Sequence, residues 1–159
     1  MRRINGLAKS DYYDALPNVK FSLDERDCLV IEASEVSNNN VVTNDLVKLI
    51  SPSSFKYLGR IDNVVNSGGV KLFPEQIEAK LAKFINIPFI IASEKNQTLG
   101  EQLILILEED SSKPIFDIKT AFSILSNYER PKKIYIFSKF PFTETGKVKR
   151  SELLDNLIE

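Results

Sequence analysis

The chain has no histidine and only one cysteine, Cys28, among its 159 residues. Histidine is the commonest general base and metal ligand near neutral pH, so its absence excludes Ser-His-Asp catalysis and histidine-bound metals. A single cysteine can form neither an internal disulfide nor a thiolate cluster for zinc, which favours a reducing compartment. Cys28 lies in an alternating β-like run, where we expect a small core residue rather than a nucleophile. The sequence therefore predicts no metal site.

An excess of charge of one sign is also missing, because 21 Lys and Arg residues face 22 Asp and Glu residues. No global field would draw the protein to nucleic acid, and the basic residues of 139–150 are too few for a nucleic-acid footprint. No apolar run approaches the roughly 20 residues that span a bilayer, and the N-terminus lacks a signal-peptide core. We therefore expect a cytoplasmic protein with no nucleic-acid partner and no membrane span.

The first part of the chain has the hydrophobic pattern of β-strands. Residues 19–33 and 41–60 each form two β-rich runs around a polar turn, which is typical of hairpins. A third hairpin, at 63–73, folds at Gly68 and Gly69, because glycine adopts the positive φ that tight turns require. These patterns predict three successive hairpins.

From Pro74 onward the pattern changes to helices and strands in alternation. Pro74 suits the first position of an amphipathic helix, with Ile77, Leu81, Phe84 and Ile85 on one face. Later elements are expected as strands at 87–93, 101–109 and 133–137, a helix from near Ser112 to before Pro131, and a final helix carrying Leu153, Leu154, Leu157 and Ile158. The predicted fold class is α+β: a β-rich N-terminal segment, then a small domain of a β-hairpin, a short sheet and about three helices.

Lys147 follows Gly146 at the tip of a short polar loop, PFTETGKVKR at 141–150. The Gly-Lys pair is unlike a phosphate-binding P-loop, which needs a second glycine and a hydroxyl directly after the lysine. Val148 occupies that position instead. Taken alone, the loop leaves Lys147 either solvated or directed at a partner elsewhere.

Three motifs together carry a family resemblance: TNDL at 43–46, YLGRIDNVVNSGGVKLFPEQIEAKL at 57–81, and PFTETGKVKR at 141–150. In order and approximate spacing they resemble Thr-Gly-Asp-Leu, Gly-Arg-x-Asp with Pro-x-x-Ile-Glu, and Gly-Lys-x-x-Arg of the AMP-forming adenylating enzymes, the acyl-CoA synthetase and luciferase superfamily. Asn44 replaces the glycine of the first motif. Residues 43–45 with 66–71 most closely resemble the o-succinylbenzoate:CoA ligases of menaquinone synthesis.

The resemblance implies an ATP-dependent ligase that joins a small-molecule carboxylic acid to CoA through an acyl-adenylate, using ATP, Mg²⁺ and CoA. Residues 1–60 would be the β-rich end of the family's large adenylating domain, and residues 61–159 its mobile C-terminal lid domain. The family's phosphate loop and adenylate-binding segment are missing. We therefore expect an inactive fragment that binds none of these cofactors tightly and has the missing N-terminal adenylating domain as its partner. The alternative is a noncatalytic module that binds nucleotide or a partner protein.

The resemblance also implies that three residues contact the nucleotide or the reacting groups. Asp45 would accept hydrogen bonds from the ribose hydroxyls, and Arg60 would face ribose oxygens or phosphate. Lys147 would be catalytic, placing a positive charge between the carboxylate and the α-phosphate. The alternatives are turn hydrogen bonds for Asp45, a surface ion pair for Arg60 and simple solvation for Lys147.

Three further residues would serve the movement of the lid domain. Asp62 would be the hinge whose backbone rotation swings the domain between two poses. Gly68 and Gly69 would let their hairpin approach the thiol arm of CoA, although a hairpin turn favours glycine at these positions in any case.

Overall fold

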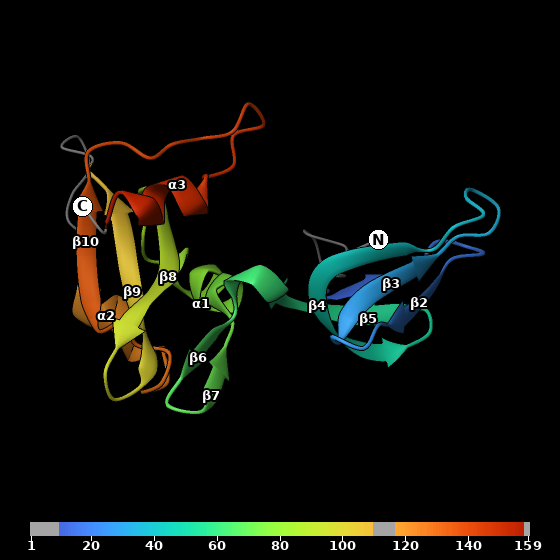
Figure 1. The fold of residues 1–159 in the computed structure, drawn as a ribbon, viewed down its shortest axis with the longest axis horizontal. Coiled ribbons are helices and arrows are strands. Elements are labelled where there is room, and N and C mark those ends of the chain that lie inside the picture. The colour runs from blue at the N-terminus through green and yellow to red at the C-terminus, as the bar shows by residue number, and fades with distance from the viewer. Residues whose placement is uncertain (1–9, 110–116, 158–159) are drawn as a thin grey trace. The chain divides into compact units, whose positions relative to one another are not determined.

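The computed structural model describes residues 10–109 and 117–157, and the chain divides into two compact units, Met1–Val64 and Val65–Glu159 (Figure 1). A short 3₁₀ turn, η1 (Ile61–Asn63), ends the first unit. The division falls after Val64, slightly beyond the expected boundary between residues 60 and 61.

The first unit is a five-stranded antiparallel sheet in the order β1-β5-β4-β3-β2. Its strands are β1 (Tyr12–Asp14), β2 (Lys20–Leu23), β3 (Cys28–Glu32), β4 (Val41–Ser51) and β5 (Ser54–Arg60). The hairpins predicted at 19–33 and 41–60 are confirmed. Strand β1 was not predicted, because three residues are too few to show a period.

Aromatic contacts hold the core of the first unit. The ring of Phe55 stacks on Tyr13, with centroids 5.1 Å apart, and meets the edge of Phe21 at 4.9 Å. Leu29 and Val47 complete the buried cluster. The core therefore joins β1 and β5 at one edge of the sheet to β2 and β3 at the other.

The described residues of the second unit form a mixed sheet and three helices, which confirms the α+β prediction. The strands are β6 (Val65–Ser67), β7 (Val70–Leu72), β8 (Phe89–Asn96), β9 (Gly100–Glu108) and β10 (Lys133–Phe137), and the helices are α1 (Pro74–Leu81), α2 (Ile118–Ser123) and α3 (Arg150–Asp155). Strand β9 pairs antiparallel with β8 and β6 and parallel with β10. None of the described helices is long and apolar enough to cross a membrane.

Strand β9 is buried on both faces, and each face belongs to a different core. Leu103, Leu105 and Leu107 pack in one cluster with buried residues of α1 and with Ala121 of α2. Ile104 and Ile106 pack in the other cluster with Leu153 of α3 and Phe140. Because strand side chains alternate, one strand anchors α1 and α2 on one face of the sheet and α3 on the other.

The helices are shorter than the sequence pattern suggests. α1 ends at Leu81, so Phe84 and Ile85 lie beyond it, although Ile85 still packs in the same core. α2 ends at Ser123, well before Pro131, and is capped by the Asp117 carboxylate, which accepts a hydrogen bond from Lys119 N at 2.9 Å. The expected start of this helix near Ser112 and the apolar Ile158 lie outside the described residues.

Candidate functional site

Asp45 and Arg60, the predicted nucleotide residues, face each other across β4 and β5. Arg60 Nη1 lies 3.9 Å from Asp45 Oδ1, and Arg60 Nη2 lies 3.1 Å from Asp62 Oδ2. The hydrogen bond to Asp62 is the main cause that raises the pKa of Arg60. The structure thus brings three predicted residues together. The half-exposed Arg60 guanidinium lies between the carboxylates of Asp45 and Asp62.

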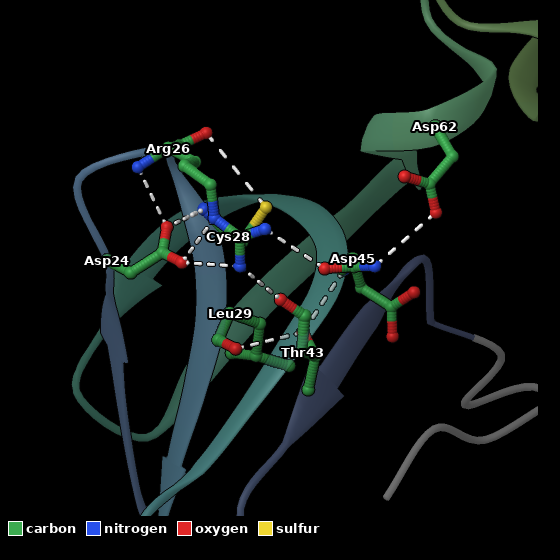
Figure 2. Close-up of polar contacts among 8 residues, drawn as sticks. Asp24, Arg26, Cys28, Leu29, Thr43, Asp45 and Asp62 are labelled. Atoms are coloured by element: carbon green, nitrogen blue, oxygen red, sulfur yellow. Dashed lines mark hydrogen bonds and ion pairs between the residues drawn. The ribbon is translucent and has the colours of Figure 1, made fainter.

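Thr43 fixes the backbone immediately before Asp45. Its hydroxyl donates to Leu29 O at 2.9 Å and accepts from Asp45 N at 3.1 Å (Figure 2). The presence of threonine in TNDL is therefore explained by structure without any ligand, because Thr43 holds the Asp45 main chain in place on β4.

A link through Asn44 was not predicted from the sequence. Arg26, in the turn between β2 and β3, donates to Asn44 Oδ1 and to Thr43 O, both at 3.1 Å. Asn44 Nδ2 in turn donates to Asp62 Oδ2 at 3.4 Å. Asn44 stands where the resembled motif has glycine, so its side chain makes a contact that a glycine cannot make.

Arg26 is held by Asp24, and the same carboxylate organises the start of β3. Arg26 Nε donates to Asp24 Oδ2 at 2.9 Å, and this hydrogen bond is the main cause that raises the pKa of Arg26. Asp24 Oδ1 accepts from Cys28 N at 2.9 Å (Figure 2). Cys28 is fully buried, and burial raises the pKa of its thiol, so the structure supports the predicted core role.

Gly68 and Gly69 form the two-residue turn between β6 and β7, with φ of +56° and +82°. Positive φ at both positions is the hairpin geometry that favours glycine. Gly68 N donates to Leu99 O at 2.9 Å, and a Cβ at this position would lie 3.1 Å from Leu99 Cδ2. The predicted turn is confirmed, and the CoA-facing role of this hairpin stays a prediction.

Lys147 lies exposed in a loop whose backbone is closed by its own hydrogen bonds. Thr143 N donates to Lys147 O at 2.7 Å, and Lys147 N donates to Thr143 Oγ1 at 3.0 Å. Gly146 makes the turn with a φ of +77°. Across the parts of the chain that the structure describes, the Lys147 ammonium group makes no ion pair, so the loop presents this charge to solvent.

The end of this loop is tied to the core by Arg150, the first residue of α3. Arg150 Nη2 donates to both carboxylate oxygens of Glu78 in α1, at 2.6 and 2.8 Å. Arg150 Nη1 donates to Ile91 O in β8 at 2.8 Å. This pairing was missed because spacing along the chain does not show a contact across 72 residues, although both residues lie in quoted motifs.

The β6–β7 turn and the loop between β10 and α3 lie at opposite ends of the second unit (Figure 1). Gly68, Gly69 and Lys147 are thus in one unit but on separate ends of it, while Asp45, Arg60 and Asp62 belong to the other unit. Residues 10–109 and 117–157 contain no group of three His, Cys, Asp or Glu side chains arranged to hold a metal ion.

Comparisons with known proteins match most of the chain. A solved structure described as an acyl-CoA synthetase (AMP-forming)/AMP-acid ligase II-like protein from Dyadobacter fermentans has a TM-score of 0.55 and 34% sequence identity, and the match covers 98% of this chain and 46% of that chain. The mitochondrial acyl-coenzyme A synthetase ACSM1 of Mus musculus is 30% identical over 106 residues, which are 61% of this chain and 18% of that protein. No protein-family model matches the chain.

A third relative is the 2-succinylbenzoate–CoA ligase of Enterococcus faecalis, which is 25% identical over 114 residues, 70% of this chain and 24% of that protein. The chain is similar to the C-terminal portion of the AMP-forming acyl-CoA synthetases. It spans no more than a quarter of the length of these two curated synthetases. The residues described above therefore represent only part of what such a synthetase contains.

Proposed function

We propose that this chain is the C-terminal part of a cytoplasmic, ATP-dependent carboxylic acid:CoA ligase that forms an acyl-adenylate and then an acyl-CoA thioester. The observation that carries the proposal is the placement of Lys147 on a backbone-fixed, exposed loop at one end of the second unit, with the Gly68-Gly69 turn at the other end. Two such ends suit an enzyme whose small domain presents different surfaces to one site in successive steps.

In the first step, a carboxylate oxygen of the acid attacks the α-phosphorus of ATP, and the bond from that phosphorus to the pyrophosphate breaks. Negative charge develops on the reacting groups while pyrophosphate leaves. The Lys147 ammonium group would offset this charge where it develops, since it is a compact cation on a flexible stem with no ion-pair partner among the described residues. Mg²⁺ would accompany the triphosphate and neutralise part of its charge.

Asp45 and Arg60 would bind the nucleoside part of the adenylate. The 3.9 Å contact between Arg60 Nη1 and Asp45 Oδ1 is too long for a hydrogen bond, so this contact does not use the acceptor capacity of Asp45. A carboxylate with such capacity can accept from both hydroxyls of a ribose diol. Arg60, held by Asp62 at 3.1 Å, would face ribose oxygens or phosphate with its planar guanidinium group.

In the second step, the sulfur of CoA attacks the carbonyl carbon of the adenylate, AMP leaves, and the thiol loses its proton. Rotation about Asp62 would withdraw the Lys147 loop and bring the Gly68-Gly69 turn toward the thiol arm. Glycine suits this approach because Gly69 has no atom within 4 Å of where a Cβ would lie, which leaves that side of the turn open.

We further propose o-succinylbenzoate as the acid, which would place the enzyme in menaquinone synthesis. The support is the pattern of residues 43–45 with 66–71 and the similarity to a 2-succinylbenzoate–CoA ligase. A mass-spectrometric screen of the complete enzyme against candidate acids, with ATP and CoA, tests this choice. Formation of a different acyl-CoA in place of o-succinylbenzoyl-CoA would overturn the choice of acid and leave the ligase chemistry in place.

The ligase proposal itself is tested by Lys147→Ala in the complete enzyme. Adenylation should fall about 10²- to 10³-fold, the scale for removing one preorganised electrostatic contact in a transition state. Thioester formation from supplied acyl-adenylate should be largely spared. Single-turnover measurements of the two half-reactions give this comparison.

The matched control is Lys119→Ala, which removes an exposed lysine from α2 in the same unit. It should leave both half-reactions unchanged. If Lys147→Ala adenylates as fast as this control, Lys147 is not catalytic. If it loses both half-reactions together with thermal stability, the lysine serves the fold instead.

A further inference from the structure

Glu78, Arg150 and Ile91 form a closed set of hydrogen bonds that joins α1, β8 and α3. Arg150 donates to both Glu78 oxygens and to Ile91 O, and Ile91 N donates to Glu78 Oε1 at 2.8 Å. Both charged side chains are mostly buried, with exposed fractions of 24% for Arg150 and 19% for Glu78. Such a two-pronged arrangement fixes the direction of the guanidinium plane as well as its position.

One consequence is structural and needs no catalysis. In the described sheet, β8 pairs only with β9, so its other side presents main-chain groups that need partners. Glu78 and Arg150 satisfy the N–H and C=O of Ile91 on that side. An arginine from any part of the chain could make these hydrogen bonds to Ile91. They therefore do not explain why the arginine stands at the end of the loop that carries Lys147.

The position of Arg150 in the chain supplies the second consequence. Lys147 precedes Arg150 by three residues. The two sides of the Lys147 loop are joined by a hydrogen bond from Lys149 N to Pro141 O at 2.9 Å and by a β-bridge between Phe142 and Val148. These contacts make the base of the loop a short ladder that runs directly into α3. Arg150 therefore fixes the point and the direction from which the Lys147 loop leaves the domain.

The Lys147 ammonium group has no ion-pair partner among the described residues that could correct its position. Its location depends on the loop backbone, and the backbone depends on its anchor. We propose that the Glu78–Arg150 pair is a positioning device that aims Lys147, so that the two residues act on the adenylation step through the lysine. The inference rests on the proposed function, since it deepens the role assigned to Lys147.

The loop contacts can be tested on the 159-residue chain without any assumption about activity. Arg150→Lys keeps the positive charge but cannot reproduce the forked contact with Glu78 and Ile91. Amide hydrogen exchange at Lys147 and Lys149, whose N–H groups are bonded to Thr143 and Pro141, should become at least several-fold faster. Unchanged exchange at both amides, with the native fold retained, would overturn the anchoring.

The catalytic part is tested in the complete enzyme by combining two substitutions. Arg150→Lys should slow adenylation about 10- to 100-fold, the scale of a misplaced catalytic group, and affect thioester formation from supplied adenylate much less. Glu78→Gln keeps an acceptor for Ile91 N and should show the same pattern more weakly, which provides a readout if Arg150→Lys proves unstable. Arg130→Lys, the same change at a site outside the loop, should alter neither step.

The double variant separates the inference from the proposed function. If Arg150 acts through Lys147, then Arg150→Lys should cost adenylation almost nothing further in a Lys147→Ala background, because coupled residues are non-additive. An undiminished Arg150 effect in that background would refute the positioning role while Lys147 stayed catalytic. A Lys147→Ala enzyme with normal adenylation would instead refute the proposed function from which the inference starts.

Discussion

Glu94, on β8, contacts side chains of two neighbouring strands in the second unit. Its carboxylate lies 2.6 Å from Lys133 Nζ and accepts from Tyr135 Oη at 2.7 Å and from Gln102 Nε2 at 2.5 Å. The hydrogen bond from Lys133 is the main cause that lowers the pKa of Glu94 below its ordinary value of 4.5, and Tyr135 and Gln102 act in the same direction. Glu94 therefore joins β8, β9 and β10 as an ionised group.

This residue predicts a dependence of stability on pH. Because the folded-state pKa lies below the unfolded one, the contribution of Glu94 is fully present above about pH 4.5 and is lost as pH falls through the folded pKa. Glu94→Gln has no proton to bind, so its free energy of unfolding should fall less steeply in acid than that of the unchanged chain. Urea unfolding of both proteins from about pH 6 to pH 3 measures the difference.

The control for this comparison is Glu25→Gln, which removes an exposed carboxylate from the first unit. It should leave the acid slope of the second unit unchanged. Parallel pH profiles for Glu94→Gln and the unchanged chain would mean that Glu94 does not contribute through its charge.

At the scale of single residues, the sequence predicts roles that depend on neighbouring residues in the chain. It does not predict roles that depend on residues far away in the chain. Gly68 and Gly69 could be predicted because a tight turn requires positive φ, and both have it. The role of Glu78 could not be predicted, since its partner Arg150 is brought near only by the packing of α1 and α3 against the sheet. Asn44 was visible as a departure from the resembled motif, but its contacts with Arg26 and Asp62 were not.

At the scale of elements, strand pairing followed the sequence pattern more closely than helix length did. The hairpins have turns whose residues are distinctive, so the pairing of each strand with its neighbour in the chain could be anticipated. Helix ends depend on packing: Ile85 is buried in the same core as α1 but lies outside the helix, so its apolar character did not distinguish helix from the turn that follows. The spacing of apolar residues therefore predicted correctly which residues are buried, but it predicted helices that are too long.

The packing of α1 predicts a large and local loss of stability on truncation of its buried face. Ile77 is 1% exposed and contributes to the same core as Leu81 and Leu105. Ile77→Ala should lower the free energy of unfolding of the second unit by about 2 to 5 kcal/mol, through lost burial and the cavity left behind. Chemical denaturation followed by a probe in the second unit measures this.

Ile124→Ala is the matched control, because Ile124 is 43% exposed at the end of α2. The same truncation there should cost less than about 1 kcal/mol, since most of the side chain is already in water. Equal losses for the two variants would contradict the core assigned to α1.

At the scale of the whole molecule, the residues assigned to one reaction are divided between two compact units. Asp45, Arg60 and Asp62 lie in the first, and the Gly68-Gly69 turn and the Lys147 loop lie in the second. The resemblance to adenylating enzymes predicted a boundary near Asp62, and the chain divides between Val64 and Val65, one residue beyond the end of η1, which contains Asp62. A short segment between two independently packed cores is where a few dihedral angles can carry a large rotation.

Asp62→Pro in the complete enzyme tests whether Asp62 is that hinge. Proline fixes φ near −65°, so it should restrict the rotation and hold the second unit in one of two poses. One half-reaction should then survive better than the other, and single-turnover rates of adenylation and thioester formation measure the ratio. Asp62→Ala removes the same carboxylate from Arg60 and Asn44 but leaves φ unrestricted, so it should keep the ratio of the unchanged enzyme. If both variants lower the two half-reactions equally, the effect comes from the lost carboxylate contacts, and the rotation must be carried by other residues of the boundary.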